Sequence, residues 1–333
     1  MKIFLTGGTG FIGSYVLRTL VKNKNMDIVA ARRKTSPMDL VKDIEGIEWR
    51  ECNLLDVVQI EEIIRGCDTV VHIAGSVTFS SWKQDQIFKS NVDITANLVN
   101  VALESKVNRF IHFSSVAALG LSSKLIDEAQ VWAENNSKSY YSLSKYLGEK
   151  EAWRGFAEGL NVSIINPAFT IGSGLWDEGP MSIISKIDQG LKYYPTGSNG
   201  IVDVRDVADM CLKLLDNTDL AGRRFICSGH NVSHYHLMSM MCDSLGKPHP
   251  SKPLSGVLGQ LAWRGASLAA RLQGKESLLS KEAYTIASAH LTYDNSQSVG
   301  LLGMQYKPLQ QTIDDTIACY KKSKDLGGNF AMI

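Results

Sequence analysis

The sequence is poor in the residues that mark several specialised classes of protein. It has six cysteines among 333 residues and no Cys-x-x-Cys pair, which argues against zinc ribbons and redox-active dithiols. Its apolar content of 44% and charged content of 21% are ordinary for a globular chain and exclude disorder. We expect free, buried thiols of the kind found in a reducing compartment at Cys52, Cys67, Cys211, Cys227, Cys242 and Cys319.

The sequence also lacks a large excess of charge of either sign and a long apolar run. The 35 basic and 34 acidic residues leave a net charge of +1, so no long-range field favours nucleic acid. The first residues do not form a charged segment followed by a long apolar one, as a secretory signal would. No apolar run reaches the ~18 residues of a spanning helix. We therefore expect a cytoplasmic protein with no nucleic-acid partner.

Residues 254–272 raise a separate membrane question. The segment is apolar on much of its surface, but Arg264 and Arg271 interrupt it. A helix of this kind usually covers a substrate pocket or packs on a core, and Trp263 would suit an apolar cleft. The alternative is a helix that lies on a bilayer surface.

Short apolar runs alternate with helical patterns through the first half of the chain. This order predicts a parallel sheet with helices on both faces. The expected strands are Ile3–Leu5, Ile28–Ala31, Ile47–Glu51, Thr69–Ile73, Arg109–Ser114 and Val162–Ile165. The expected helices are Phe11–Val21, Asp56–Arg65 with Asp56 as N-cap, Asp85–Ser105 and Ser139–Glu158.

The pattern loosens after Pro167. Residues 168–200 are rich in Gly, Ser and Pro and predict loops with one short helix. A helix at Val204–Leu215 and a strand at Arg224–Cys227 follow, and residues 233–290 look mainly helical. The segment from Lys321 is polar, and we expect a frayed tail there.

A glycine-rich loop joins the first strand to the first helix. In TGGTGFIG, Gly8, Gly10 and Gly13 fit GxGxxG, and Gly7 gives a second frame with Gly10 and Gly13. Glycines there allow a tight turn and close approach to a pyrophosphate, which the helix N-terminus attracts. The alternative is a tight turn only, but the strand–loop–helix context favours a dinucleotide. We expect contacts from Gly7, Gly10, Phe11, Ile12 and Gly13.

The chain is expected to have two parts, which divide at Pro167. We expect a Rossmann-type, doubly wound α/β domain in residues 1–167, with further core elements around 201–228. A smaller, mostly helical substrate-binding lobe is expected in residues 168–200 and 229–320. Residues 321–333 form the expected polar tail.

The end of the second strand bears on the choice of dinucleotide. NAD-binding folds usually place Asp or Glu there, to bind the ribose 2′-hydroxyl. This chain has Arg32, Arg33 and Lys34 instead, and arginine can bind a 2′-phosphate. We therefore expect NADP rather than NAD; the alternative is a solvated basic turn. Asn53 and Leu54, after the third strand, are placed to contact the adenine.

A tyrosine and a lysine four residues apart, Tyr141 and Lys145, share one face of the helix expected at 139–158. A free phenol has a pKa near 10, too high for proton exchange at neutral pH. A neighbouring ammonium lowers that pKa, so the pair is a plausible general acid–base. The alternative is an ordinary pair on a helix surface.

These motifs together resemble the extended short-chain dehydrogenase/reductase family, also called the NAD-dependent epimerase/dehydratase family. The resemblance rests on TGGTGFIG, YSLSK and the strand ending in Phe113-Ser114-Ser115, and covers nearly the whole chain. Asn91-Val92, Asn166-Pro167 and the segment 202–208 resemble further elements of the family, in its order. The resemblance implies cofactor contacts from Ala74, Asn91, Tyr141, Lys145 and Pro167.

The resemblance also implies a catalytic triad of Ser115, Tyr141 and Lys145. Ser115 would polarise the substrate oxygen, Tyr141 would exchange the proton, and Lys145 would lower the pKa of Tyr141 and bind the nicotinamide ribose. Ser115 is chosen because it stands five residues before Gly120, as in the family, with Ser114 as its competitor.

Departures from the family's usual residues limit the range of reactions that we expect. Val116-Ala117 replace the Asp-Glu pair of sugar dehydratases, Leu119 replaces a tyrosine common in epimerases, and Asn166 replaces an arginine. A nucleotide-sugar substrate is thus less expected, and the chain is closer to dihydroflavonol-reductase-like and 3β-hydroxysteroid-dehydrogenase-like members. We expect NADPH-dependent reduction of a ketone or aldehyde on a fairly apolar small molecule, or the reverse oxidation, in a homodimer. The alternatives are an epimerase that retains NAD(P) and a non-catalytic NADP(H) sensor.

Other polar and aromatic residues carry weaker signals. His230, His234 and His236 cluster, but no acidic or cysteine ligand stands beside them at a known spacing, so we expect no metal site. His72 and His112 lie inside expected strands, where packed and hydrogen-bonded side chains are expected. Weaker candidates for substrate contact are Phe79, Phe169, Trp176, Tyr235 and His236. For each of them we expect a structural role rather than contact with the substrate.

Overall fold

The computed structural model describes most of the chain. The described residues are 1–23, 25–77, 84–132, 139–177, 179, 181–256, 259–260, 263–265 and 280–325. Phe79 and most of the segment 254–272 lie outside them, and so do residues 326–333.

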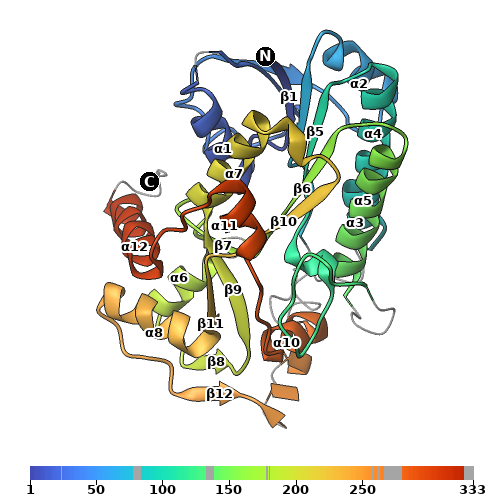
Figure 1. The fold of residues 1–333 in the computed structure, drawn as a ribbon. Coiled ribbons are helices and arrows are strands. Elements are labelled where there is room, and N and C mark those ends of the chain that lie inside the picture. The colour runs from blue at the N-terminus through green and yellow to red at the C-terminus, as the bar shows by residue number, and fades with distance from the viewer. Residues whose placement is uncertain are drawn as a thin grey trace.

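A parallel seven-stranded sheet forms the centre of the molecule (Figure 1). Its strands are β1 (Lys2–Thr6), β2 (Asp27–Arg32), β3 (Ile47–Glu51), β4 (Thr69–His72), β5 (Arg109–Phe113), β6 (Val162–Pro167) and β10 (Arg223–Cys227). They pair in the order β10-β6-β5-β4-β1-β2-β3. The strand order reverses between β1 and β4, and a crevice at the carboxyl ends of the strands is expected at such a point. The predicted doubly wound α/β fold is confirmed.

Helices cover both faces of the sheet because its strands are apolar on both sides. Ile3 and Leu5 of β1 pack with α1 (Phe11–Leu20) and α7 (Val204–Asp216), whereas Phe4 points to the opposite face. There it packs with α2 (Val57–Ile64), α4 (Ile94–Glu104) and α5 (Tyr140–Ala157). The predicted cap of α2 is confirmed, since the Asp56 carboxylate accepts hydrogen bonds from two backbone N–H groups.

The helix expected over 85–105 is interrupted. It consists of α3 (Gln84–Phe88), a π-helical turn at Lys89–Asp93, and α4. Such turns are uncommon and occur often at functional sites. This one contains Asn91, which is buried against α5.

A second lobe lies beyond the carboxyl ends of the strands, in the lower half of Figure 1. Its core is formed by α6 (Ser182–Asp188), α8 (His234–Leu245) and α12 (Leu309–Asp325). A three-stranded sheet has the order β11 (His230–Ser233), β9 (Ser198–Asp203), β7 (Phe169–Ile171), and β12 (Lys252–Leu254) pairs with β8 (Tyr193–Pro195). Helices α10 (Lys281–Ser288) and α11 (Ser296–Leu302) precede α12. Short 3-10 turns lie at Val116–Leu119 and Thr218–Leu220.

The one short helix predicted in residues 168–200 is found as α6, but the loops predicted around it are wrong, because this region also contributes β7, β8 and the start of β9. Gly200 lies inside β9, where a Cβ atom would stand 2.7 Å from the Tyr293 ring. A glycine normally weakens a strand, but here it permits close packing. The frayed tail expected from Lys321 is also corrected: α12 continues to Asp325, because Tyr320 and Ser323 are still buried.

The free thiols expected from the sequence are found in the structure. All six cysteines are free; five are buried and Cys319 is half-buried. Among the residues that the structure describes, we find no helix with the length and apolar character needed to cross a membrane.

Candidate active site

The glycine loop follows β1 and lies against the residues that follow the neighbouring strand β4. Gly7 has a φ of +77°, and a Cβ atom there would come within 2.5 Å of the Ala74 backbone nitrogen. A Cβ atom at Gly13 would meet the Gly7 carbonyl oxygen, so both positions require glycine. Gly8 instead packs on Leu17, where a Cβ atom would approach its Cδ1 to 2.8 Å.

The start of α1 offers free backbone donors to an anion. Gly10 is the N-cap and supplies no side chain, while its carbonyl accepts from the Ser14 N–H at 2.9 Å. The first N–H groups of a helix have no intrahelical partner, and here they belong to Phe11, Ile12 and Gly13. A loop without Cβ atoms and an uncapped helix start together fit the pyrophosphate of a dinucleotide.

The basic turn follows β2. The Arg32 guanidinium lies at its end and forms an ion pair of 3.1 Å with Glu51 of β3. Arg33 and Lys34 are exposed, and the Arg33 backbone N–H donates to the Ser36 hydroxyl at 3.0 Å. The turn thus presents cations and a hydroxyl, although sequence reasoning missed the carboxylate of Glu51 beside them.

The two expected adenine contacts follow β3. Asn53 is exposed, and its side-chain oxygen accepts the Leu55 N–H at 3.1 Å. Leu54 is half-buried and packs against the core on the α2 and α4 face. The side-chain oxygen of Asn53 is therefore already engaged in fixing the turn.

Asn91 positions its neighbours, rather than simply facing a cofactor. Its amide accepts from the Ser76 N–H at 2.8 Å and donates to the Ser76 carbonyl and to the Ser144 hydroxyl. A Cβ atom at Gly75 would stand 3.0 Å from the Asn91 side-chain oxygen and 3.7 Å from Lys145 Nζ. The Lys145 ammonium therefore lies beside Gly75, the residue after Ala74, whose backbone approaches Gly7 of the glycine loop.

A buried histidine connects the same elements. Thr95 donates to the Asn91 carbonyl at 2.8 Å and lies 3.0 Å from His72 Nε2, so Nε2 must carry the proton. His72 Nδ1 then accepts from Thr6, whose hydroxyl oxygen accepts the Ala74 N–H. Burial, with Lys145 nearby, lowers the pKa of His72 to about 3, so the ring stays neutral. The predicted hydrogen bonding is confirmed for His72.

The structure brings together the three residues of the expected triad. Ser115 follows β5, and its hydroxyl accepts the Ala117 N–H at 3.1 Å as N-cap of the next turn. The same hydroxyl hydrogen-bonds Tyr141, in the first turn of α5. Lys145 lies one turn further along α5 and donates from Nζ to the Phe113 carbonyl at 2.9 Å. Ser114 instead donates to Glu149 at 2.6 Å, so Ser115 is the serine that contacts the tyrosine.

The electrostatics of the pair differ from expectation. Burial raises the pKa of Tyr141, and the group that lowers it is Ser115 rather than Lys145. Burial lowers the pKa of Lys145 to about 8, while Glu149 opposes that change. The physical reason is that the Lys145 ammonium is directed to the carbonyl of Phe113.

Sequence reasoning missed a set of polar residues behind the triad. Glu149 is buried at the position i+4 from Lys145, so its helical spacing could have revealed it. Asn166, noted only as a departure from the family, donates to the Ser115 carbonyl at 3.0 Å. Pro167 ends β6 opposite Cys227 of β10, beside this network.

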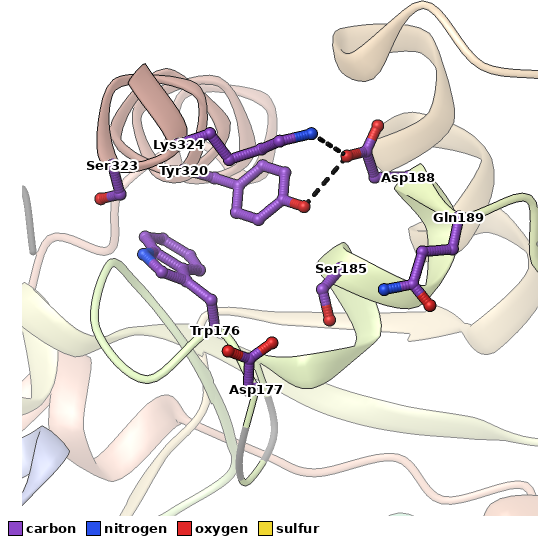
Figure 2. Close-up of a pocket in the computed structure, with 8 residues that line it drawn as sticks. All are labelled: Trp176, Asp177, Ser185, Asp188, Gln189, Tyr320, Ser323 and Lys324. Carbon is purple, nitrogen blue, oxygen red and sulfur yellow. Dashed lines mark hydrogen bonds and ion pairs between the residues drawn. The ribbon is translucent and has the colours of Figure 1, made fainter. Parts of the chain in front are cut away.

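A pocket of about 400 Å³ lies elsewhere, between α6 and α12 (Figure 2). Asp188 binds Lys324 at 2.7 Å and Tyr320 at 3.0 Å there, and also pairs with Lys247. These partners, Lys324 first, lower the pKa of Asp188 to about 2. Of the residues expected to contact substrate, Trp176 is among those that line this pocket, and the Asp188 carboxylate links α6 to α12.

The remaining candidates lie in the second lobe. Trp176 is buried against Tyr320, and Phe169 packs on the same core, whereas the Tyr235 ring contacts the Tyr194 ring at a tilt of 53°. His230 binds the Lys307 carbonyl at 2.8 Å. Among the described residues, no three metal-binding side chains are grouped to hold an ion.

Comparisons with known proteins identify the family of the chain. The model of the NAD dependent epimerase/dehydratase family matches residues 3–227. A protein of Synechocystis sp. assigned as a dihydroflavonol 4-reductase is 28% identical over 94% of this chain and 93% of its own. Cinnamoyl-CoA reductase 1 of Petunia hybrida is 28% identical over 76% of this chain and 78% of its own.

A solved structure shares the fold. The dTDP-glucose 4,6-dehydratase DesIV of Streptomyces venezuelae, solved with NAD bound, has a TM-score of 0.79 at 18% identity, covering 98% of each chain. Because the family model spans more than half of the sequence, the chain belongs to the NAD-dependent epimerase/dehydratase family of extended short-chain dehydrogenases/reductases.

Proposed function

We propose that this protein is an NADPH-dependent reductase of a ketone or aldehyde carried by a fairly apolar small molecule. The observation that carries the proposal is the hydrogen bond between Ser115 and Tyr141, one turn before a buried Lys145. Lys145 in turn lies beside Gly75, and the preceding Ala74 approaches Gly7 of the glycine loop. The reductase relatives support this reaction class.

Each residue of the triad has one task. The Ser115 hydroxyl, already an acceptor for the Ala117 N–H, keeps its own proton to donate to the substrate oxygen. Tyr141 gives its proton to the same oxygen as negative charge develops there. Lys145 stabilises the resulting phenolate. When bound, the cofactor supplies the hydride to the carbonyl carbon.

The cofactor fits the glycine loop, and two features support its phosphorylated form. Gly7, Gly10 and Gly13, with the start of α1, would hold the pyrophosphate. Arg32 and Arg33 would bind a 2′-phosphate, since a guanidinium forms charge-assisted pairs with phosphate oxygens. Asn53, Leu54, Ala74 and Pro167 are the further proposed contacts. We also propose a homodimer that pairs through α4 and α5.

Nucleotide retention and a carbonyl screen test the proposal together. The purified protein is analysed by mass spectrometry for bound nucleotide and assayed for NADPH oxidation with a panel of apolar ketones and aldehydes. A reductase releases NADP in each turnover, so we expect exchange of nucleotide and consumption of NADPH matching the alcohol formed. Tightly retained nucleotide with no net oxidation would favour an epimerase, and silence over a broad panel would favour a sensor.

A further inference from the structure

Glu149 is a buried carboxylate for which the triad mechanism has no use. Its side chain is only 3% exposed, and it lies on α5 in register with Tyr141 and Lys145. Residues spaced by four share one helix face, so the three side chains form a line. An unpaired buried charge is strongly destabilising, and Glu149 therefore needs compensation from other elements.

Four donors provide that compensation. One carboxylate oxygen accepts from Ser114 at 2.6 Å and from Asn166 at 2.7 Å. The other accepts from Arg224 at 3.0 Å and from Trp153 at 3.2 Å. Three of these partners, the amide nitrogen, the guanidinium and the indole, can only donate here, and they reach both carboxylate oxygens. The set of partners thus fits the ionised form.

The partners connect Glu149 to Ser115. The Asn166 amide nitrogen that donates to Glu149 also donates to the Ser115 carbonyl at 3.0 Å. Ser114, bound to the same oxygen of Glu149, is the residue before Ser115. The Glu149 carboxylate therefore holds the backbone on both sides of Ser115. It binds the preceding Ser114 directly, and it binds the Ser115 carbonyl through the Asn166 side chain.

The charge of Glu149 also acts on Lys145. Burial favours the neutral amine of Lys145, and Glu149 is the group that opposes it. The other titratable groups that interact with Lys145 are His72 on β4 and His112 on β5, while Tyr141 lies one turn before it on α5. Burial keeps both imidazoles neutral, so they do not stabilise an ammonium. Arg224 lies behind Glu149 and offsets part of its charge.

We propose that Glu149 is a positioning residue of the active site, which keeps Lys145 in its ammonium form and fixes Ser115 through Ser114 and Asn166. The proposal rests on the reductase function given above. Glu149 touches neither the substrate nor the cofactor in this account. Its two effects are separable, because one depends on charge and the other on hydrogen bonds.

The charge effect is tested by NMR titration of Lys145 in protein labelled with 13C at lysine Cε, assigned with Lys145→Met. Glu149→Gln should lower the midpoint of the Lys145 titration by about one pH unit or more, because it removes the nearest negative charge. Glu149→Asp should return the midpoint to near the wild-type value. Trp153→Phe removes one hydrogen bond but keeps the charge, and as matched control it should leave the midpoint in place.

A second variant tests the same effect with the opposite sign. Arg224→Met removes the cation behind Glu149, so the Lys145 midpoint should rise; this result is informative even if Glu149→Gln does not fold. An unchanged midpoint in either folded variant overturns the charge effect. The titration needs no substrate, so a carbonyl screen without activity, which would refute the reductase, leaves this result standing.

The tether to Ser115 is tested with Asn166→Ala. We expect kcat to fall by about tenfold or more, because a small displacement of Ser115 weakens its contact with the substrate oxygen. The Lys145 midpoint should remain near that of the wild type, since Glu149 keeps its charge. Full activity in this variant would overturn the tether.

Discussion

At the scale of single residues, the choice between the two dinucleotides depends on a few charges after β2. The Arg32 guanidinium forms an ion pair with Glu51, which holds it in place and neutralises part of its charge. Arg33 and Lys34 are exposed and have no carboxylate in the same short turn. The sequence shows the cations, whereas Glu51, on a neighbouring strand, could be identified only once the strands were paired.

The double variant Arg32→Asp with Arg33→Ala tests this turn. It should weaken NADP binding by about tenfold or more, because hydrogen bonds to a charged phosphate are lost. NAD binding should change little. Fluorescence titration with each nucleotide measures both affinities, and Arg50→Ala, an arginine of β3 paired with Glu48, is the control. Unchanged NADP affinity in the double variant would show that the turn does not bind the 2′-phosphate.

At the scale of secondary structure, the catalytic helix depends on one close contact. A Cβ atom at Gly148 would meet the carbonyl oxygen of Asn91 in the π-helical turn, so α5 packs there through bare backbone. The same helix carries Tyr141 and Lys145. A change at Gly148 therefore affects stability and activity together.

Gly148→Ala should lower Tm by roughly 4 °C or more, because the Cβ atom pushes α5 away from Asn91. Turnover should fall with it as Tyr141 moves. Gly300→Ala is the matched control: this glycine lies in α11, and a Cβ atom there meets nothing within 4 Å. Differential scanning calorimetry gives both Tm values, and a Gly148→Ala protein as stable as the control would contradict the contact.

Local patterns predicted some elements better than others. The strand at Ile47–Glu51 and the cap at Asp56 depend on neighbouring residues, and both are found as predicted. Strand β9 was missed because its glycine is explained only by Tyr293, far along the chain. The spacing of Glu149 after Lys145 is visible in the sequence, but three of its four partners come from β6, β10 and the end of β5, so the network around it is not.

At the scale of the whole molecule, two buried imidazoles make folding sensitive to acid. His72 keeps a pKa of about 3, and burial lowers the pKa of His112 well below its usual value. The unfolded chain takes up these protons near pH 6.5, but the folded chain does not. Stability is therefore present above that pH and is lost as the pH falls below it.

His112→Leu tests this dependence. In the described part of the chain neither ring nitrogen of His112 has a hydrogen-bond partner, so the sequence expectation of a bonded ring is not met and little is lost on removal. Between pH 6.5 and 5, the free energy of unfolding should fall with pH less steeply in the variant than in the wild type. The difference between the two slopes should approach about 1.4 kcal/mol per pH unit, the value for one proton. Urea denaturation over this range measures it, with His236→Gln as an exposed control. Identical slopes would contradict the prediction.

The most direct test of the central claim is Tyr141→Phe, assayed for NADPH binding and for carbonyl reduction in the same preparation. Removal of the phenol oxygen takes away the proton donor but leaves the glycine loop and the basic turn intact. The account predicts that kcat falls by about 100-fold or more while the Kd for NADPH stays close to that of the wild type. Turnover at the wild-type rate would contradict it.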